Sequence, residues 1–372
     1  MLYLLYERLA EFKTHIPILN LMKYLTFRTG MAVFTAQIIA IAMGSRFIRW
    51  MRARQGKGQP IRTDGIARHV VEKAGTPTMG GLAIVAGCVV GYLVSDAYDG
   101  VFTWTGIISV LAIAGAGVVG FLDDWIKIRN ERNLGLSKRA KMLGLLSVAI
   151  GFAVLMVWRT NVHTTISFTQ WHDLGWNLGK VGWCIWAVLL ISASSNAVNL
   201  TDGLDGLAAG SASLVFGAYI VIGYWIFRHP GVYGINVGLD LAVVAAAMMG
   251  ACAGFLWWNA APARIFMGDT GSLAIGTALA ALALSSSTVL LLPIVGLLFV
   301  VETVSVILQV ASFRATKGKR RIFRMAPIHH HFELVGWPET TVIIRMWMIT
   351  AACTIAGLGL FYREFIRFGG LG

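Results

Sequence analysis

Long apolar runs, separated by short polar or charged segments, constrain the fold of this sequence more than any other feature. A membrane-spanning helix needs about 20 predominantly apolar residues. Hydrophobic residues make up 57% of the chain and charged residues 13%, whereas a soluble domain is about 45–50% apolar and about 25% charged. Runs that could span a membrane cover residues 25–48, 79–95, 104–122, 141–158, 181–198, 206–226, 240–258, 271–286, 288–312 and 341–361.

We therefore predict an all-α integral membrane protein, a bundle of about ten transmembrane helices that forms a single domain over residues 1–372. Residues 1–24 are expected to form an amphipathic entry segment. Residues 160–179 alternate polar and β-prone side chains and include Trp171 and Trp176. This pattern predicts a short external (periplasmic) β-hairpin with interfacial aromatic residues.

The basic residues divide the connecting segments into two groups. The net charge is +13, and 22 of the 31 Lys and Arg residues lie in the segments after the first, third, fifth, seventh and ninth runs. Cytoplasmic loops of membrane proteins carry an excess of Lys and Arg. This bias predicts that those segments are cytoplasmic and that both termini lie outside. Because the basic residues flank apolar runs, we attribute the charge to membrane topology and expect no nucleic-acid partner.

Five of the ten aspartates lie where an apolar run meets a predicted cytoplasmic segment: Asp123, Asp124, Asp202, Asp205 and Asp269. Carboxylates at a membrane border are unfavourable unless they are paired or bind a metal. We therefore predict a functional site at this face. On a helix the adjacent Asp123 and Asp124 side chains diverge by about 100°. We expect one to bind a hard cation and the other to act as a base, with a metal or Lys/Arg offsetting their charge at a helix C-terminus.

Two neighbouring segments carry further polar groups. In residues 196–206, Asp202 and Asp205 are expected to share a face of a helical turn, and the twelve-residue ligand pattern of a calcium-binding loop is absent. Asp269 precedes a membrane run. Thr270 or Ser272 could cap the first turn of that helix, and the amide groups of the helix could then contact phosphate. Phe266 could stack on a base or lie against lipid.

Three more segments are candidates for substrate contact. Residues 327–333 include His329, His330 and His331, whose adjacent side chains should point apart; this argues against a zinc site and favours phosphate contact or acid–base chemistry over an exposed run. Residues 73–81 include Lys73 and Thr78, which suit phosphate contact at a helix start. Glu302 lies within an apolar run, where a carboxylate is either functional or packed against Thr303 or Ser305. Gln309 lies two turns farther along.

The order of these motifs between about ten membrane runs resembles the polyprenyl-phosphate N-acetylhexosamine-1-phosphate transferases. Within that group, residues 73–81 and 327–333 are similar to the phospho-N-acetylmuramoyl-pentapeptide transferases of bacterial peptidoglycan synthesis. The resemblance implies that UDP-N-acetylmuramoyl-pentapeptide and undecaprenyl phosphate react to give lipid I and UMP. It also implies Mg²⁺, a homodimer in the bacterial cytoplasmic membrane, and an active site on the cytoplasmic side.

The resemblance also implies roles for individual residues. Asp269 would be the main Mg²⁺ ligand, with Asp123 and Asp124 beside it. Asn199, Asp202 and the three histidines would line the diphosphate and sugar site. The uridine would contact Lys73, Asp205 and Phe266, while Thr78 and Gln309 would contact substrate. The implied catalytic residues are Asp123, Asp124, Asp269 and His330.

The chemistry leaves alternatives open. Asp123 could deprotonate the lipid phosphate for direct attack, which we favour because a phosphate monoester has a second pKa near 6, or an aspartate could form a covalent phospho-intermediate. A sister transferase that uses UDP-GlcNAc is the nearest rival. A transporter would place ionisable groups near the bilayer midplane, whereas these aspartates gather at one face.

Overall fold

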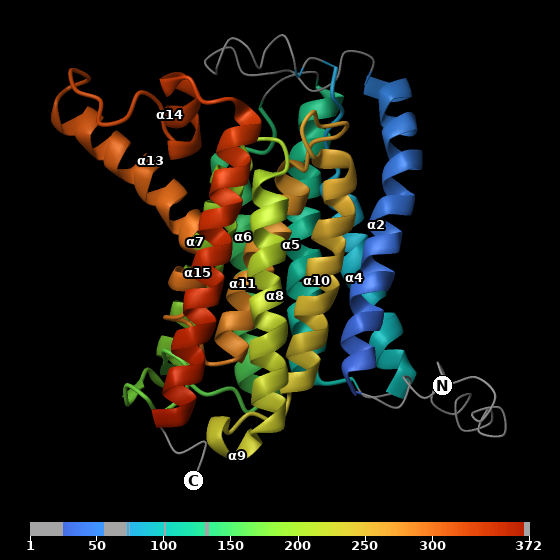
Figure 1. Ribbon diagram of the computed structural model, residues 1–372, viewed down its shortest axis with the longest axis vertical. Helices are drawn as coiled ribbons and strands as arrows, with labels where there is room; N and C mark the ends of the chain where they lie inside the picture. The colour runs from blue at the N-terminus through green and yellow to red at the C-terminus, as the bar shows by residue number, and fades with distance from the viewer. Residues whose placement is uncertain (1–24, 56–72, 74, 100–101, 131–133, 368–372) are drawn as a thin grey trace.

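The computed structural model of the chain describes residues 25–55, 73, 75–99, 102–130 and 134–367. Within these residues the chain forms an upright helix bundle (Figure 1). The long helices are α2 (Leu25–Gln55), α4 (Gly81–Asp99), α5 (Trp104–Arg129), α6 (Lys138–Arg159), α7 (Gly179–Thr201), α8 (Leu207–Arg228), α10 (Gly238–Asn259), α11 (Gly268–Ser285), α13 (Leu297–Ala315) and α15 (Glu339–Arg367). The short elements are α9 (Pro230–Tyr233), α12 (Leu292–Val295), α14 (Ile328–Val335), β1 (Thr165–Ile166) and β2 (Trp176–Asn177).

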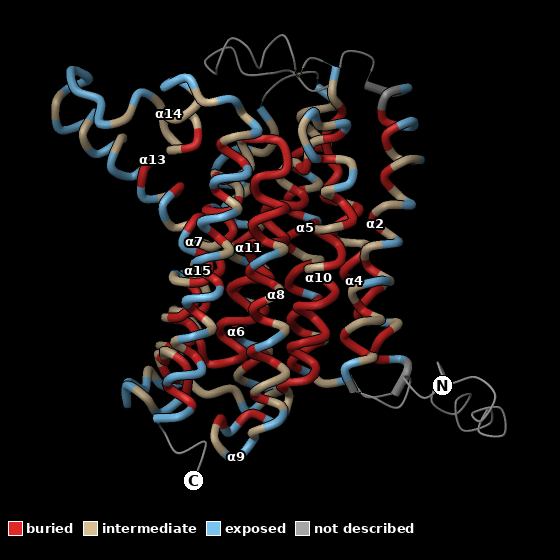
Figure 2. Tube along the Cα trace, viewed as in Figure 1, coloured by how far each residue is buried: buried red, intermediate tan, exposed pale blue. Residues whose placement is uncertain are grey.

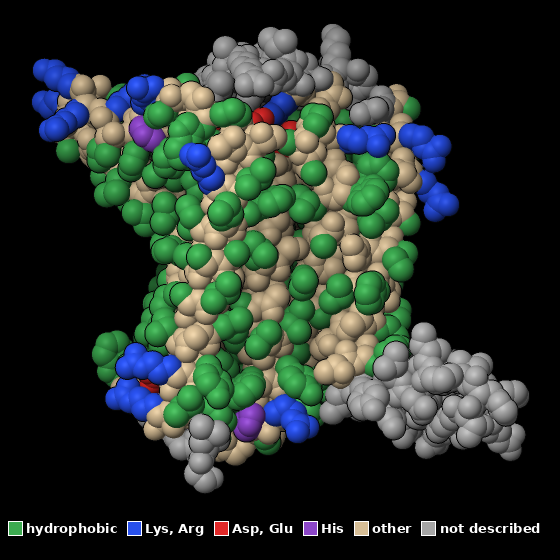
Figure 3. All heavy atoms as spheres, in the orientation of Figure 1, with side chains coloured by type: hydrophobic (Ala, Val, Ile, Leu, Met, Phe, Trp, Pro, Cys, Tyr) green, Lys and Arg blue, Asp and Glu red, His purple; other side chains and the backbone are tan. Residues whose placement is uncertain are grey.

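The long helices follow the predicted apolar runs in order, and an all-α membrane protein is confirmed. Among the described residues, eight helices are long and apolar enough to cross a membrane. The other two long helices are α4, whose apolar part is Gly81–Ala97, and α11. Hydrophobic side chains cover the middle of the molecular surface, and Lys and Arg gather towards its two ends (Figure 3). The predicted segment 1–24 lies outside the described residues.

One predicted span is wrong in its bounds. The run at 288–312 is not a single helix, because α12 and α13 are separated at Gly296. Pro293 lacks an amide hydrogen and Gly296 has a low helix propensity, so a continuous helix is disfavoured here. The helix α13 therefore begins at Leu297 and leans away from the bundle at its far end (Figure 1).

The predicted hairpin is confirmed as a short antiparallel pair. Thr165 pairs with Asn177 and Ile166 pairs with Trp176. Asp173 closes the intervening segment by accepting hydrogen bonds from the backbone amides of residues 168–170.

The buried centre of the bundle depends on small residues. α10 lies at the middle, with most of its residues buried (Figure 2). A Cβ atom at Gly120 of α5 would overlap the backbone of Asp269, and one at Gly81 of α4 would overlap the backbone of Gly271. Small residues let membrane helices approach closely. The N-terminal end of α11 is thus held directly against α4 and α5.

Buried charges also lie at the end of the bundle that contains the N-terminus of α5. Arg28 of α2 pairs with Asp96 of α4 at 2.7 Å, and both side chains are almost fully buried. Asp240 of α10 accepts hydrogen bonds from Thr103 and Tyr92. These contacts join α2, α4, α5 and α10 and give partners to two of the aspartates that lie outside the predicted cytoplasmic segments.

Candidate active site

Three aspartates from two helices form the densest carboxylate cluster of the described residues. Asp123 and Asp124 lie near the C-terminal end of α5, and Asp269 lies in the first turn of α11. One oxygen from each lies within 4.8 Å of the other two, a spacing that could hold a metal ion. The structure thus brings together the three residues predicted as metal ligands.

Two lysines offset the charge of this cluster. The Lys127 ammonium lies 2.6 Å from Asp123 Oδ2, 2.7 Å from Asp269 Oδ2 and 3.5 Å from Asp124 Oδ1. Lys141 of α6 lies 2.7 Å from the same Asp269 oxygen. Compensation by a metal or by Lys/Arg was predicted from the sequence, but these two lysines were not identified. The i,i+4 spacing of Asp123 and Lys127 was the available signal.

The two adjacent carboxylates of α5 have different surroundings. Asp124 accepts hydrogen bonds from the Asp269 amide (3.1 Å), the Thr270 amide (3.0 Å) and the Thr270 hydroxyl (2.8 Å). It therefore caps α11 from a neighbouring helix, which is favourable for a carboxylate at a helix N-terminus. The expectation that Thr270 or Ser272 would cap α11 and leave its amides for phosphate is wrong.

In both Asp123 and Asp269, one carboxylate oxygen lies beside the lysines and the other accepts a hydrogen bond. Asp123 Oδ1 accepts from the Leu136 amide at 2.8 Å, which ties the segment just before α6 to α5. Asp269 Oδ1 accepts from the Asn199 amide group at 2.7 Å. Asn199, a predicted site residue on α7, thus contacts the carboxylate cluster directly.

The turn between α7 and α8 separates its two aspartates. Asp202 and Asp205 do not share a helical face, because α7 ends at Thr201 and an irregular turn follows, with Gly206 in the left-handed region at φ 79°. Asp202 is only partly exposed, and burial together with the negative charges of Asp269, Asp124 and Asp205 raises its pKa to about 8.

Asp205 belongs to a second charged group with Lys73. The Lys73 ammonium lies 2.7 Å from Asp205 and 2.8 Å from Glu339, at the start of α15. Burial by itself lowers the pKa of Lys73, but the two carboxylates outweigh it and raise the pKa above its ordinary value. These three residues, with Thr76 and Pro262, line a cavity of about 230 Å³. Glu339 was not predicted as a site residue from the sequence.

Backbone contacts join the segment around Thr78 to the segment around Phe266. The Phe266 amide donates to Pro77, and the Gly80 amide donates to the Phe266 carbonyl. Thr78 is fully buried behind the carboxylate cluster, where a Cβ atom at Gly268 would crowd its hydroxyl. Phe266 is partly buried.

The histidine run meets α13 and the α7–α8 turn. His329 Nδ1 lies 2.9 Å from Glu302 Oε2, with both side chains fully buried, and His330 Nδ1 lies 2.8 Å from Glu333 Oε2. The His329 and His330 rings are in contact, with centroids 4.2 Å apart, so the expectation that neighbouring side chains point apart is wrong for this pair. His331 instead accepts a hydrogen bond from the Arg324 amide.

Gln309 has an alternative to the predicted substrate contact. Its amide donates to the Phe323 carbonyl and accepts from the backbone amides of Ile322 and Phe323. These bonds hold the loop after α13 against that helix.

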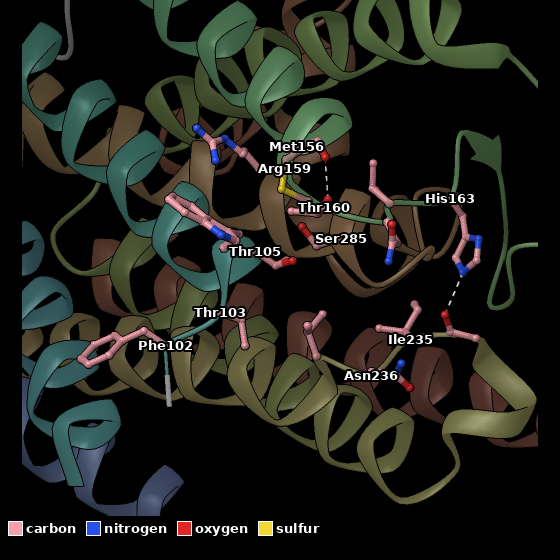
Figure 4. A pocket seen from close by; sticks show the side chains of 15 residues that line it. Phe102, Thr103, Thr105, Met156, Arg159, Thr160, His163, Ile235, Asn236 and Ser285 are labelled. Atoms are coloured by element: carbon pink, nitrogen blue, oxygen red, sulfur yellow. Dashed lines mark hydrogen bonds between the residues drawn. The ribbon is translucent and has the colours of Figure 1, made fainter. Parts of the chain in front are cut away.

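A larger cavity, of about 410 Å³, lies at the opposite end of the bundle (Figure 4). It is lined near the start of α5 by Phe102 and Thr103 and on α6 by Arg159, whereas Asp123 lies near the end of α5. Of the described residues that line it, none is a carboxylate. The carboxylate end is therefore the better candidate for metal-dependent chemistry.

Known proteins are similar to this chain over most of its length. Residues 104–287 match the family described as glycosyl transferase family 4, and residues 73–85 match the phospho-N-acetylmuramoyl-pentapeptide-transferase signature 1. A phospho-N-acetylmuramoyl-pentapeptide-transferase of Frankia alni is 51% identical over 354 residues, covering 91% of this chain and 98% of the relative. Transferases of the same name from Caulobacter vibrioides (49% identical, 96% and 98% covered) and Streptomyces griseus (51%, 86% and 94%) are also similar.

Proposed function

Because this chain belongs to the phospho-N-acetylmuramoyl-pentapeptide transferases, we propose that it transfers phospho-N-acetylmuramoyl-pentapeptide from its UDP-linked donor to undecaprenyl phosphate. The products are lipid I and UMP. The observation that carries this proposal is the cluster of Asp123, Asp124 and Asp269 at one end of a membrane bundle, with Lys127 and Lys141 beside it. Both substrates are anionic, so their mutual repulsion has to be offset at the site.

The residues present fit a magnesium ion. Carboxylate oxygens are the ligands that Mg²⁺ prefers, and the position between Asp123 and Asp269 already attracts the Lys127 ammonium. Asp269 and Asp123 would hold the ion, with Asp124 of α5 beside them as the cap of α11. When bound, Mg²⁺ neutralises charge on the diphosphate and improves UMP as a leaving group.

The reaction forms one P–O bond and breaks another. An oxygen of undecaprenyl phosphate attacks the phosphorus that carries N-acetylmuramoyl-pentapeptide, and the bond to UMP breaks. Asp123 would accept a proton from the lipid phosphate where that phosphate is still protonated. Lys127 and Lys141 would pair with phosphate oxygens as charge builds up on them.

The donor would extend from the carboxylate cluster towards Lys73. Asn199, Asp202 and the histidines His329, His330 and His331 would line its diphosphate and sugar. The cavity between Lys73, Asp205 and Glu339 would take the uridine, with Phe266 nearby.

The location of the site suits a soluble donor and a lipid acceptor. We infer that the protein is a multi-pass homodimer of the bacterial cytoplasmic membrane, with the active site on the cytoplasmic side and both termini outside. The bias of Lys and Arg supports this orientation. The exposed apolar side chains of α13, such as Ile307 and Leu308, would face lipid beside the site.

Release of UMP by the purified protein tests the proposal. The protein in detergent receives UDP-N-acetylmuramoyl-pentapeptide and undecaprenyl phosphate, with Mg²⁺ or with EDTA, beside an Asp269→Asn variant. We expect release that needs the lipid and Mg²⁺ and that collapses in the variant. Release only from UDP-GlcNAc would assign the sister activity, and release from neither donor would refute the enzyme function and favour a transporter.

A further inference from the structure

The cavity at the end of the bundle opposite the carboxylate cluster has no part in the proposed transfer reaction (Figure 4). Its volume of about 410 Å³ lies within the range of about 300–1,000 Å³ that is usual for small-molecule sites. Its walls come from α5, α6 and α11, from the segment before β1, and from the segment between α9 and α10. Separate parts of the chain therefore build it, and the cavity is a feature of the tertiary structure.

Contacts between two connecting segments close one side of this cavity. Nε2 of His163 lies 3.0 Å from the Gly234 carbonyl oxygen, and the His163 ring stacks on Trp171 with ring centroids 4.9 Å apart. These contacts hold the segment before β1 against the segment between α9 and α10. As in most ligand sites, this wall is in place before a ligand enters.

Arg159, at the C-terminal end of α6, gives the lining of the cavity a permanent positive charge. Its guanidinium carbon lies 5.0 Å from the centre of the Trp104 ring and 4.1 Å from the centre of the Trp158 ring. Within the described part of the chain it makes no hydrogen bond or ion pair. Contact with aromatic rings uses the faces of a guanidinium, so its N–H groups stay available for an oxyanion.

Uncharged hydrogen-bonding groups line the interior. The Ser285 hydroxyl has no partner among the described residues, although only 5% of this residue is exposed. A buried polar atom without a partner needs an explanation such as a bound ligand. In the view of Figure 4, Ser285 lies between Arg159 and Asn236. Asn161 and Asn236 also line the cavity and are exposed, so their amide groups can reach a ligand.

The charge of the lining favours an anion. Of the described residues that line the cavity, none is a carboxylate. Asp240 does not line it but lies behind Thr103, whose hydroxyl donates a hydrogen bond to it. An anion beside Arg159 would therefore gain an ion pair without displacing a carboxylate.

The mouth of the cavity lies at the level expected for lipid headgroups. Trp104 is the first residue of one candidate membrane span, and Arg159 is the last residue of another. Phe102, Trp104 and Trp158 are 43%, 53% and 69% exposed. Tryptophan is enriched where a membrane meets water. A ligand at this mouth would thus meet water on one side and lipid on the other.

We propose that this cavity binds the phosphate group of a lipid headgroup, with Arg159 as the ion-pairing partner at the mouth and Ser285 as a hydrogen-bond donor inside. The acyl chains would leave past Phe102 and Trp104 into the bilayer. With the orientation inferred above, this lipid would lie in the outer leaflet. The proposal does not depend on the transfer reaction, so failure of UMP release leaves it intact.

Native mass spectrometry of the full chain in detergent measures the binding. The protein receives phosphatidylglycerol, or diacylglycerol with the same acyl chains, each with and without inorganic phosphate as competitor. We expect the parent to bind phosphatidylglycerol at least about tenfold more tightly than diacylglycerol, and Arg159→Gln to lose about tenfold in affinity for phosphatidylglycerol, the size of a lost hydrogen bond to a charged group. Inorganic phosphate at the same concentration should not displace the lipid.

Two further variants separate the cavity from the general surface charge. Arg228→Gln removes an exposed arginine at the C-terminal end of α8 that does not line the cavity, and it should bind phosphatidylglycerol as the parent does. Asn236→Trp fills the cavity from an exposed position and should lose the bound lipid while Arg159 is kept. Unfolding midpoints are recorded for each variant, and Asn236→Trp carries the test if Arg159→Gln does not fold.

Equal affinities of the parent for phosphatidylglycerol and diacylglycerol would overturn the proposal, because the phosphate would then contribute nothing. Equal losses in Arg159→Gln and Arg228→Gln, or parental lipid binding by Asn236→Trp, would show that the lipid binds outside this cavity. Displacement by an equal concentration of inorganic phosphate would assign the site to the free ion and overturn the lipid as its ligand.

Discussion

Replacing Asp124 and Asp123 separately by Asn tests whether these adjacent carboxylates of α5 have different tasks. Asp124 accepts three hydrogen bonds from the first turn of α11, which carries Asp269, and its side chain is almost fully buried. Asp123 accepts one bond from the Leu136 amide and pairs with Lys127. We expect Asp124→Asn to destabilise the protein and Asp123→Asn mainly to remove activity.

The magnitude follows from the donors that face each oxygen. An Asn at position 124 keeps one acceptor oxygen and places an NH₂ group against a donor, so one or two of the three bonds are lost. Hydrogen bonds to charged groups contribute about 1.5–3 kcal/mol each, so we expect a loss of about 3 kcal/mol. Asp123→Asn should lose about 1 kcal/mol, since its remaining oxygen can still accept from Leu136 and Lys127 keeps Asp269 as partner.

Thermal unfolding in detergent, followed by tryptophan fluorescence, measures the stability of both variants, and UMP release measures their activity. We expect Asp124→Asn to unfold at a clearly lower temperature than Asp123→Asn in EDTA, with both inactive. Equal unfolding temperatures, or a lower one for Asp123→Asn, would refute the assignment of Asp124 as the cap of α11.

Further predictions concern the α7–α8 turn and the Lys73 group. Gly203→Ala should lower kcat/KM for the donor more than about tenfold, because its Cβ would overlap Nε2 of His329; a parental value would contradict the crowding. Glu339→Gln should weaken inhibition by UMP about tenfold, since Lys73 loses one of two carboxylates, and unchanged inhibition would place the nucleotide elsewhere. The raised pKa of Asp202, about 8, means that its carboxyl binds a proton more tightly in the folded than in the unfolded protein. The folded state is therefore penalised increasingly from about pH 4 to about pH 8. In EDTA, the unfolding temperature of Asp202→Asn should exceed that of the parent by an amount that grows across that pH range and then levels off. A difference that shrinks as the pH rises would be evidence against the raised pKa of Asp202.

The membrane helices were predictable because lipid leaves a strong signal in composition. Each long helix follows an apolar run, and the carboxylates that share a site stood out because acids are rare at such borders. The resemblance placed Lys73 and Asp205 together at the uridine, although it did not predict the ion pair between them. What the sequence could not supply was the partner of each group, since contacts such as Asp124 with Thr270 join residues 146 positions apart.

Errors arose where a local rule met a tertiary contact. Thr270 and Ser272 are good capping residues for α11 by local preference, yet a carboxylate from α5 takes that place. The spacing of Asp202 and Asp205 suggested one helical face, but α7 ends at Thr201 and the turn directs Asp205 to Lys73. In both cases a buried carboxylate accepts several hydrogen bonds, and these stabilise the structure more than the local capping or spacing preference would.

The close packing of helices and the geometry of the carboxylate cluster have one cause. Asp124 can cap α11 only if the backbones of α5 and α11 approach within hydrogen-bonding reach, and Gly120 permits this because any side chain there would overlap Asp269. The same approach brings Asp269 beside Asp123 and Lys127. Lipid provides no hydrophobic driving force for helix association, so the close packing of small residues stabilises the bundle. On these helices the small residues have a second role. They fix the distance between the carboxylates, which is what a metal-dependent phosphoryl transfer requires.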